Sequence, residues 1–154
     1  MRRATSRRVV AASIEHAFRA ATSAERLPEW NPFFVEVHDV SGDLDRVGAS
    51  FDAVMRIGGR QLETQHIVTS FERPRLIVIA ATAPKGGRLI WSRRFEGVGS
   101  RRTEIETILD YTVPADLAPS ETDRSRLQRE IEGEVMRSVD NFCALVEGVA
   151  ALVG

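Results

Sequence analysis

The chain has 154 residues, of which 43% are hydrophobic and 28% are charged, values typical of one globular domain. Its formal net charge of −1 argues against a general nucleic-acid-binding protein, because such proteins carry a strong basic excess. Cys143 is the single cysteine, so an internal disulfide is excluded, and no apolar run reaches the roughly 20 residues that span a bilayer. No apolar signal-peptide segment follows the basic N-terminus. We therefore expect a cytoplasmic protein with one domain over residues 1–154 and no integral membrane association.

The N-terminal part of the chain predicts one strand followed by two short helices. The apolar stretch 9–12 is typical of a strand, and the basic residues of 2–8 suit a solvated strand edge or tail, or a surface for an acidic partner or membrane headgroup. Ser13 is a candidate helix N-cap, because its hydroxyl can accept a hydrogen bond from a free backbone N–H of the first turn. A second helical segment is expected over 23–27, and Pro28 either ends it or lies in a turn.

From Phe33 to Val113 the hydrophobic pattern has a period of two, which is typical of antiparallel strands with one buried face. Apolar residues alternate with polar ones in four clear runs, at Phe33, Val35 and Val37, at Phe51, Ala53, Met55 and Ile57, at Leu89, Trp91 and Phe95, and at Ile105, Leu109, Tyr111 and Val113. Turn-forming residues separate the runs at 58–59, 72–75, 84–87 and 97–100. We expect six strands in this region in addition to the first one.

The last part of the chain predicts one long helix. Residues 114–120 suit a loop, and from about Glu121 to Leu152 apolar residues recur at steps of three and four, at Leu127, Ile131, Val135, Val139, Phe142, Val146 and Val149. A curved sheet with one apolar face has to cover that face, and this helix carries a matching stripe. We therefore predict an α+β fold in which a seven-stranded curved antiparallel sheet wraps around a long C-terminal helix, with two short helices between strands 1 and 2.

Three segments resemble a known superfamily. They are Val10-x-Ala12-Ser13-x-Glu15-x-Ala17-Phe18, then Glu29-Trp30-Asn31-Pro32-Phe33 after the helical pair, and Gly42 followed by Gly48. With the element order, they are similar to the SRPBCC superfamily, which includes START-related lipid-binding domains, Bet v 1-like allergens and bacterial polyketide cyclase/dehydrase-type proteins. The resemblance implies a helix-grip fold with an apolar ligand cavity between sheet and helix. It does not imply one activity, since members include carriers, cyclases, chaperone activators and hormone receptors.

Projected onto that fold, the alternation places a set of mostly apolar residues inward. The strands contribute Phe33, Val35, Phe51, Met55, Trp91, Phe95, Leu109 and Tyr111, and the helix contributes Val135, Val139 and Phe142. We predict ligand contacts from Trp30, Phe33, Phe51, Met55, His66, Trp91, Arg93, Tyr111, Val139 and Phe142. A plain packed core is the alternative interpretation of the same pattern.

Three polar residues of the inward set are candidates for chemistry, because burying them unpaired costs about 1–3 kcal/mol each. Arg93 can bind a carboxylate, phosphate or enolate, unless a bulge turns it outward or it reaches the rim. His66 can act as a general base or as a partner for a ligand carbonyl, or it is a structural or exposed histidine. Tyr111 can orient a ligand, or it is a core tyrosine bonded to backbone.

Three functions compete. The first is binding of a small hydrophobic ligand, such as a lipid or polyketide, by a carrier or sensor. The second is a polyketide cyclase/dehydrase-type enzyme that uses His66, Arg93 and Tyr111. The third is a protein-interaction module resembling chaperone activators, with a closed interior. We expect no cofactor, and no metal site because the three histidines and Cys143 lack zinc spacing. Monomer and homodimer stay open.

Overall fold

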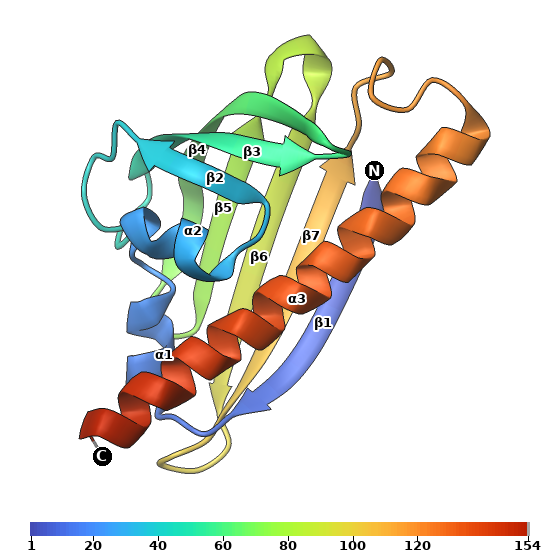
Figure 1. Ribbon diagram of the computed structural model, residues 1–154. Helices are drawn as coiled ribbons and strands as arrows, with labels where there is room; N and C mark the ends of the chain where they lie inside the picture. The colour runs from blue at the N-terminus through green and yellow to red at the C-terminus, as the bar shows by residue number, and fades with distance from the viewer. Residues whose placement is uncertain (154) are drawn as a thin grey trace.

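Seven strands and one long helix dominate the structure, a computed structural model that describes the backbone of residues 1–153 and the side chains of residues 1–148 (Figure 1). The elements in chain order are β1 (Arg2–Val10), α1 (Ile14–Ala20), the 3₁₀ turn η1 (Ala24–Arg26), α2 (Leu27–Trp30), β2 (Phe34–His38), β3 (Ser50–Ile57), β4 (Arg60–Glu72), β5 (Leu76–Thr82), the 3₁₀ turn η2 (Pro84–Gly86), β6 (Arg88–Gly97), β7 (Thr103–Thr112) and α3 (Glu121–Val153).

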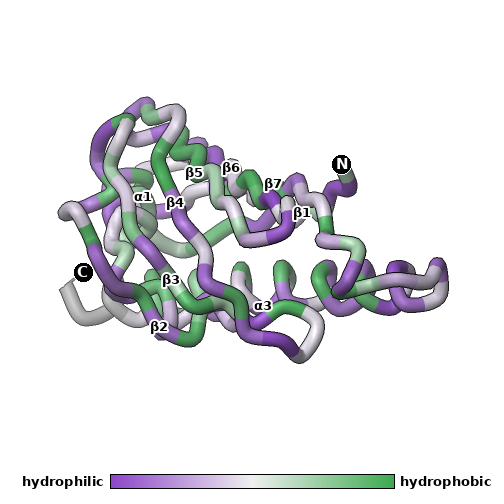
Figure 2. The backbone as a smooth tube through the Cα atoms, turned by 90° about the horizontal axis from the view of Figure 1, so that it is seen from above, coloured by the Kyte–Doolittle hydropathy of each residue, from purple (hydrophilic) through white to green (hydrophobic). Residues whose placement is uncertain are grey.

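The strands form one antiparallel sheet in the order β1-β7-β6-β5-β4-β3-β2. Each strand from β2 to β6 pairs with the next strand along the chain, while β1 pairs with β7 and so brings the start of the chain to the far edge. Seen from above, the sheet curls from β1 and β7 round to β3 and β2, and α3 lies on its inner side (Figure 2). The predicted helix-grip architecture is confirmed.

The helix α3 packs through the stripe that its sequence predicts. The stripe residues Leu127, Ile131, Val135, Val139, Phe142 and Val146 are all buried, whereas the side chain of Val149 lies outside the described residues. Their spacing matches the 3.6-residue turn of an α-helix, so one face stays on the sheet throughout. Among the described residues, no helix is long and apolar enough to cross a membrane.

The first strand is longer than the apolar pattern predicts. It covers Arg2–Val10 instead of 9–12 and pairs with β7 along its whole length. Arg3 and Arg7 pair with acidic residues of β7, and Arg8 pairs with an aspartate of α3. Backbone pairing with β7 holds this edge strand, and only Ala4 and Val10 in it are buried, so hydrophobic alternation does not reveal it.

The predicted register of β2 is wrong. The pattern suggests that Phe33, Val35 and Val37 share an inward face, but Val35 is 41% exposed and Phe34 is buried. The pairing of β2 with β3 shifts between Phe34 and Glu36. A β-bulge of this kind adds one residue to a strand and so reverses the alternation of its side chains. Val35 therefore contributes nothing to the interior.

The short helices follow the prediction in one part and depart from it in another. Ser13 caps α1, since its Oγ accepts a hydrogen bond from the His16 N–H at 3.2 Å. The expectation that helix ends at Pro28 is wrong, because α2 begins at Leu27 and continues to Trp30. Proline fits there because it lies in the first turn, where its missing N–H has no helical acceptor.

The turn between β3 and β4 is the predicted two-residue glycine hairpin. Gly58 and Gly59 have φ angles of 60° and 74°, and Ile57 pairs directly with Arg60. Such turns require positive φ at both central positions, which glycine adopts without strain. The turn also lies against α3, because a Cβ on Gly58 would be 3.1 Å from the Leu127 side chain.

Candidate ligand-binding site

All ten predicted ligand-contacting residues are buried, namely Trp30, Phe33, Phe51, Met55, His66, Trp91, Arg93, Tyr111, Val139 and Phe142. Trp30 comes from α2, Phe33 precedes β2, the next six come from β3, β4, β6 and β7, and the last two come from α3. Burial fits both a packed core and a ligand site, so their binding roles stay predictions.

The most unusual buried group is the guanidinium of Arg93 on β6. Arg93 is 5% exposed and, among the described residues, has no carboxylate partner. Its guanidinium carbon lies 5.0 Å from the ring centroid of Trp30 and 5.1 Å from that of Trp91. Burial lowers the pKa of Arg93 to about 10, so the group is still protonated at pH 7. Arg93 therefore carries a positive charge into the interior, where two indole rings face it.

Aromatic residues from separate parts of the chain fix this group in place. The Trp30 ring meets Phe142 of α3 at a centroid distance of 4.8 Å, and the Trp91 ring meets Phe33 at 5.6 Å. The Nε1 atoms of both tryptophans are buried without a partner among the described residues. We call Arg93, Trp30, Trp91, Phe33 and Phe142 the Arg93 cluster. The polar side-chain atoms of this cluster are all hydrogen-bond donors, so the cluster suits a ligand group with several hydrogen-bond acceptors.

His66 on β4 lies in a different aromatic cluster. Its ring stacks on Phe51 with centroids 4.5 Å apart, and Phe34 lies at 5.3 Å. The Thr64 hydroxyl is 2.8 Å from His66 Nε2 and donates to the Ala53 carbonyl at 3.2 Å. Because that hydroxyl has one hydrogen, Nε2 carries the ring hydrogen and the buried Nδ1 is left as an acceptor without a described partner. Burial lowers the pKa of His66 to about 3, so the ring is neutral at pH 7.

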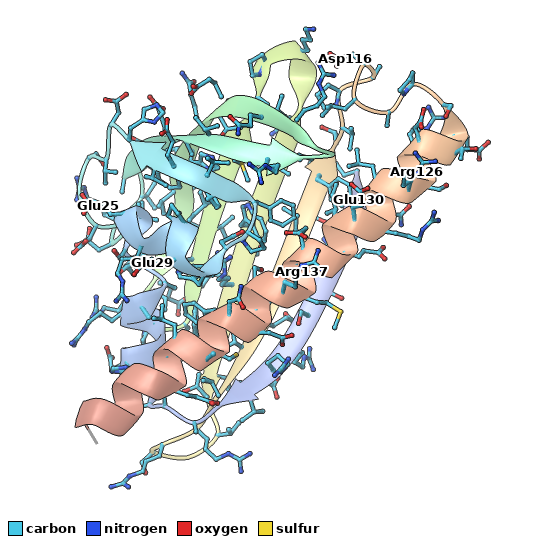
Figure 3. The ribbon with its side chains drawn as sticks, in the orientation of Figure 1. Glu25, Glu29, Asp116, Arg126, Glu130 and Arg137 are labelled. Carbon is cyan, nitrogen blue, oxygen red and sulfur yellow. The ribbon has the colours of Figure 1, made fainter. Side chains whose placement is uncertain are left out.

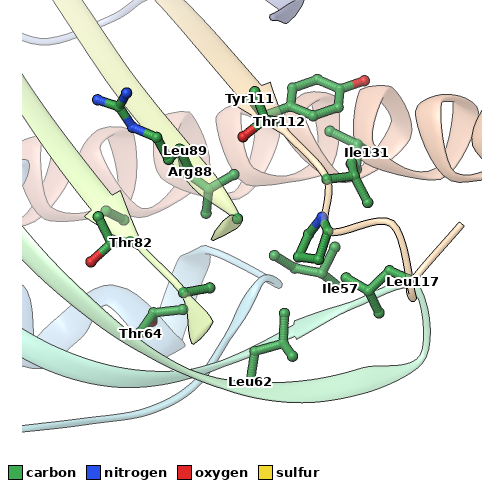
Figure 4. Close-up of a pocket in the computed structure, with 15 residues that line it drawn as sticks. Ile57, Leu62, Thr64, Thr82, Arg88, Leu89, Tyr111, Thr112, Leu117 and Ile131 are labelled. Carbon is green, nitrogen blue, oxygen red and sulfur yellow. The ribbon is translucent and has the colours of Figure 1, made fainter. Parts of the chain in front are cut away.

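A small apolar cavity lies at one end of the sheet, beside the 113–120 segment (Figure 4). Its volume of about 20 Å³ leaves room for roughly one water molecule. Tyr111 is the one catalytic candidate in its wall, and Thr64 connects the cavity to His66. The Tyr111 hydroxyl is buried without a partner among the described residues, and burial raises the pKa of Tyr111.

The three catalytic candidates face different parts of the interior. His66, Ala81, Leu89 and Tyr111 form one row across β4, β5, β6 and β7. Three strand spacings, about 14 Å along the sheet, therefore separate the backbones of His66 and Tyr111. Arg93 lies four residues beyond Leu89 on β6, or roughly 13 Å along the strand. Acid–base groups act on one substrate atom from about 3 Å. Among the described residues, no hydrogen bond or ring contact joins any two of the three, so the structure does not bring them together as one acid–base group.

A group of possible metal ligands lies at the surface, outside this interior. One ligand atom each from His38, Asp39 and Asp52 lies within 4.8 Å of the others. The pairing of β2 with β3 sets His38 opposite Asp52, and linear spacing does not reveal such a contact. All three side chains are exposed or half-buried. Acidic groups at a surface commonly lie close together without an ion, so we derive no metal function from them.

Sequence reasoning missed some buried polar residues. Thr107 pairs with Arg93 across β6 and β7 and is buried. Its place in the alternating pattern of β7 is a signal that would have found it. Ser138 of α3 is buried and donates to the Val135 carbonyl at 2.7 Å. Asn31 is buried as well; its Oδ1 accepts a hydrogen bond from the Phe33 N–H at 3.1 Å, while its Nδ2 has no partner among the described residues.

A curled antiparallel sheet that grips one long helix, with a mostly apolar interior between them, defines a START-like protein of the SRPBCC superfamily. The aromatase/cyclase ZhuI from Streptomyces sp. R1128 is similar in structure, with a TM-score of 0.77, 15% identity, and 95% of this chain and 93% of that chain covered. A protein from Thermus thermophilus has a TM-score of 0.72 and 17% identity over 97% and 99% of the two chains. A START superfamily protein from Mycobacterium smegmatis has a TM-score of 0.67 and 13% identity over 99% of both chains.

At these identities the structural similarity shows the fold alone. No curated protein sequence is similar enough to match the chain. The model of the family described as polyketide cyclase / dehydrase and lipid transport matches residues 1–147, and the chain belongs to this family.

Proposed function

We propose that the chain binds a small, largely apolar molecule that carries an acidic or enolic oxygen, with Arg93 as the anchor. The observation that carries this proposal is the buried side chain of Arg93, 5% exposed, for which the described residues offer no carboxylate partner. A carboxylate or enolate would supply a negative charge and would accept hydrogen bonds from the guanidinium. The family's description, which includes lipid transport, supports a ligand that is mostly apolar.

A purely structural role gives a poorer account of Arg93. A buried charge without a partner costs several kcal/mol after relaxation, and each desolvated cation–π contact returns about 1–2 kcal/mol. An apolar side chain of similar volume would fill the same space without the penalty of burying the charge. The residue is therefore better explained by a ligand that pairs with it than by the stability of the core.

A polyketide cyclase/dehydrase-type enzyme is the second candidate, and the family match and the Streptomyces aromatase/cyclase favour it. General acid–base catalysis works best when the catalytic group titrates near the working pH. His66, with its pKa of about 3, does not meet that condition, and the structure does not bring the three candidates together as one acid–base group. A carrier or sensor is therefore the better-supported role. A protein-interaction module resembling chaperone activators would leave the unpaired charge of Arg93 without a purpose.

Two probes that differ in one group test the proposal, 1-naphthoic acid and 1-naphthalenemethanol. We expect the unaltered protein to bind the acid roughly ten- to a hundredfold more tightly, because a hydrogen bond to a charged group contributes about 1.5–3 kcal/mol. Arg93→Met should abolish this preference. Arg94→Met, which changes the exposed neighbour on the other side of β6, should keep it. Isothermal titration calorimetry measures all six affinities, two probes for each of the three proteins.

Equal affinity for the two probes in the unaltered protein would contradict the proposal, as would an acid preference that survives in Arg93→Met. Native mass spectrometry of the freshly purified protein, followed by extraction, would identify the natural ligand. An acidic amphiphile is the expected result.

A further inference from the structure

Three connections meet at the end of the sheet where the small cavity lies. They are the β3–β4 turn at 58–59, the β5–β6 connection at 83–87 and the 113–120 segment between β7 and α3. The wall of the cavity includes Gly87 from the second connection and Pro114 and Leu117 from the third (Figure 4). Since the cavity holds no more than about one water molecule, a larger molecule enters it only when this wall moves.

Asp116 joins these three connections. Its carboxylate accepts a hydrogen bond from Lys85 Nζ at 3.1 Å and lies 3.8 Å from the Arg60 guanidinium. Arg60 also donates to the Asp116 backbone carbonyl at 3.4 Å. Lys85 belongs to the β5–β6 connection, and Arg60 begins β4 directly after the glycine turn. Figure 3 shows Asp116 at the end of the molecule where these segments come together.

We propose that the 113–120 segment is a lid over the ligand cavity, and that Asp116 is the clasp that holds it closed against Lys85 and Arg60. This inference rests on the proposed function, because the lid would control entry of the ligand to the same interior. The hydrogen bond from Lys85 holds the pKa of the Asp116 carboxyl below its ordinary value, so the clasp is charged throughout the neutral range.

The strength of these contacts suits a lid that opens often. All three charged side chains are exposed, and each exposed ion pair shifts an equilibrium by about one-and-a-half- to fivefold. The two pairs together therefore contribute a factor of roughly two to twenty-five to closing of the lid. Below the clasp, Pro114 packs tightly on Gly87, since a Cβ there would lie 3.0 Å from the proline ring. Pro114 and Ala118 are both buried, so apolar contacts hold the segment on the cavity together with the clasp.

Stopped-flow fluorescence with 1-anilinonaphthalene-8-sulfonate, an apolar anion, tests the lid in the full chain. In Asp116→Asn we expect the association and dissociation rate constants to rise together by roughly two- to twenty-five-fold, with Kd unchanged within about twofold. Lys85→Gln and Arg60→Gln should each give part of that increase. Asp45→Asn is the matched control, because Asp45 is an exposed aspartate paired with Arg46 on the β2–β3 connection. It should leave both rate constants unchanged.

Hydrogen exchange of the ligand-free protein gives an independent measure of the closed lid. Exchange within 113–120 and 83–87 should be faster in Asp116→Asn than in the unaltered protein or Asp45→Asn. Unchanged exchange and unchanged rate constants in Asp116→Asn would overturn the lid. A faster dissociation with an equally weakened Kd would also overturn it, because Asp116 would then be a ligand contact. If the dye entered none of the variants, the proposal that ligands enter at this end of the sheet would be overturned.

These results separate the lid from the proposed function. If Asp116→Asn accelerates dye exchange while Arg93→Met binds the dye and both naphthalene probes as the unaltered protein does, the lid stands and the anchor fails. If the acid preference depends on Arg93 while Asp116→Asn behaves like Asp45→Asn, the anchor stands and the lid fails.

Discussion

Replacing Arg93 by methionine should make the protein more stable. Burial lowers the pKa of Arg93 from its ordinary value to about 10, which corresponds to a cost of about 3 kcal/mol for the charged form, at 1.36 kcal/mol per pKa unit. The contacts with Trp30 and Trp91 offset about 1 kcal/mol each. Methionine keeps the apolar stem and removes the charge, so we expect the free energy of unfolding to rise by about 1 kcal/mol. For a chain of this length, Tm should rise by roughly 2–4 °C.

Denaturant unfolding at pH 7 measures this change, with Arg94→Met as the control that stays within about 0.5 kcal/mol of the unaltered protein. The size of this stability difference also depends on pH. The folded guanidinium loses its proton above about pH 10 while the unfolded one keeps it to a higher pH, so the advantage of Arg93→Met should shrink as the pH rises above about 10. A loss of about 2 kcal/mol or more at pH 7 would refute the reasoning, because the stacking of Arg93 between the tryptophans would then be stabilising.

Three further substitutions test other parts of the interior. The pKa of His66 is about 3 in the folded protein and 6.5 in the unfolded chain, so the stability due to the neutral ring is lost as pH falls from 6.5 toward 3. His66→Gln should flatten that part of a profile of unfolding free energy against pH. An identical profile in the variant would argue against a buried neutral ring. Tyr111→Phe removes a hydroxyl without a described partner, so the free energy of unfolding should change by less than about 0.5 kcal/mol, whereas a loss above about 1 kcal/mol would mean that the hydroxyl is bonded in solution. Gly58→Ala and Gly59→Ala should each lower the free energy of unfolding by about 1 kcal/mol, because both positions have positive φ. Gly58→Ala should lower it further, because its methyl group would meet the Leu127 side chain. Equal losses of Tm in the two variants would contradict that contact.

The fold was predictable where burial alone decides the pattern. Phe51 and Met55 alternate with half-buried residues on β3, and the apolar stripe of α3 repeats with the helical period, so both faces are visible in the sequence. The pattern fails where polar contacts or backbone irregularity take over. Strand β1 is held by its backbone pairing with β7 and buries only Ala4 and Val10, and the bulge in β2 turns Val35 outward. Neither feature leaves a hydrophobic signal.

The candidate site was predictable to the level of side-chain direction. The inward direction of Arg93 follows from its parity with Trp91 and Phe95 on the same strand. The contact of Arg93 with Trp30 does not follow, because Trp30 comes from a short helix far away in the sequence and is placed by tertiary packing. For the same reason, the sequence could not reveal that the three polar candidates face separate regions, since strand register and sheet order together set those distances.

The positions of the Arg93 cluster and of the cavity constrain how one ligand would use both. Leu89 lines the cavity and Arg93 lies four residues farther along β6, so about 13 Å of strand separates the two regions, with Trp91 between them. A molecule whose acidic group pairs with Arg93 while its apolar part lies below the lid would have to span that distance and displace side chains on the way. Such a ligand would contact α3 and the sheet at both ends, and it would bind the closed form more tightly than the open one. Binding would then fill the interior and also slow the opening of the lid. Slow opening would help a carrier to retain its ligand, whereas an enzyme with rapid product release would need fast opening.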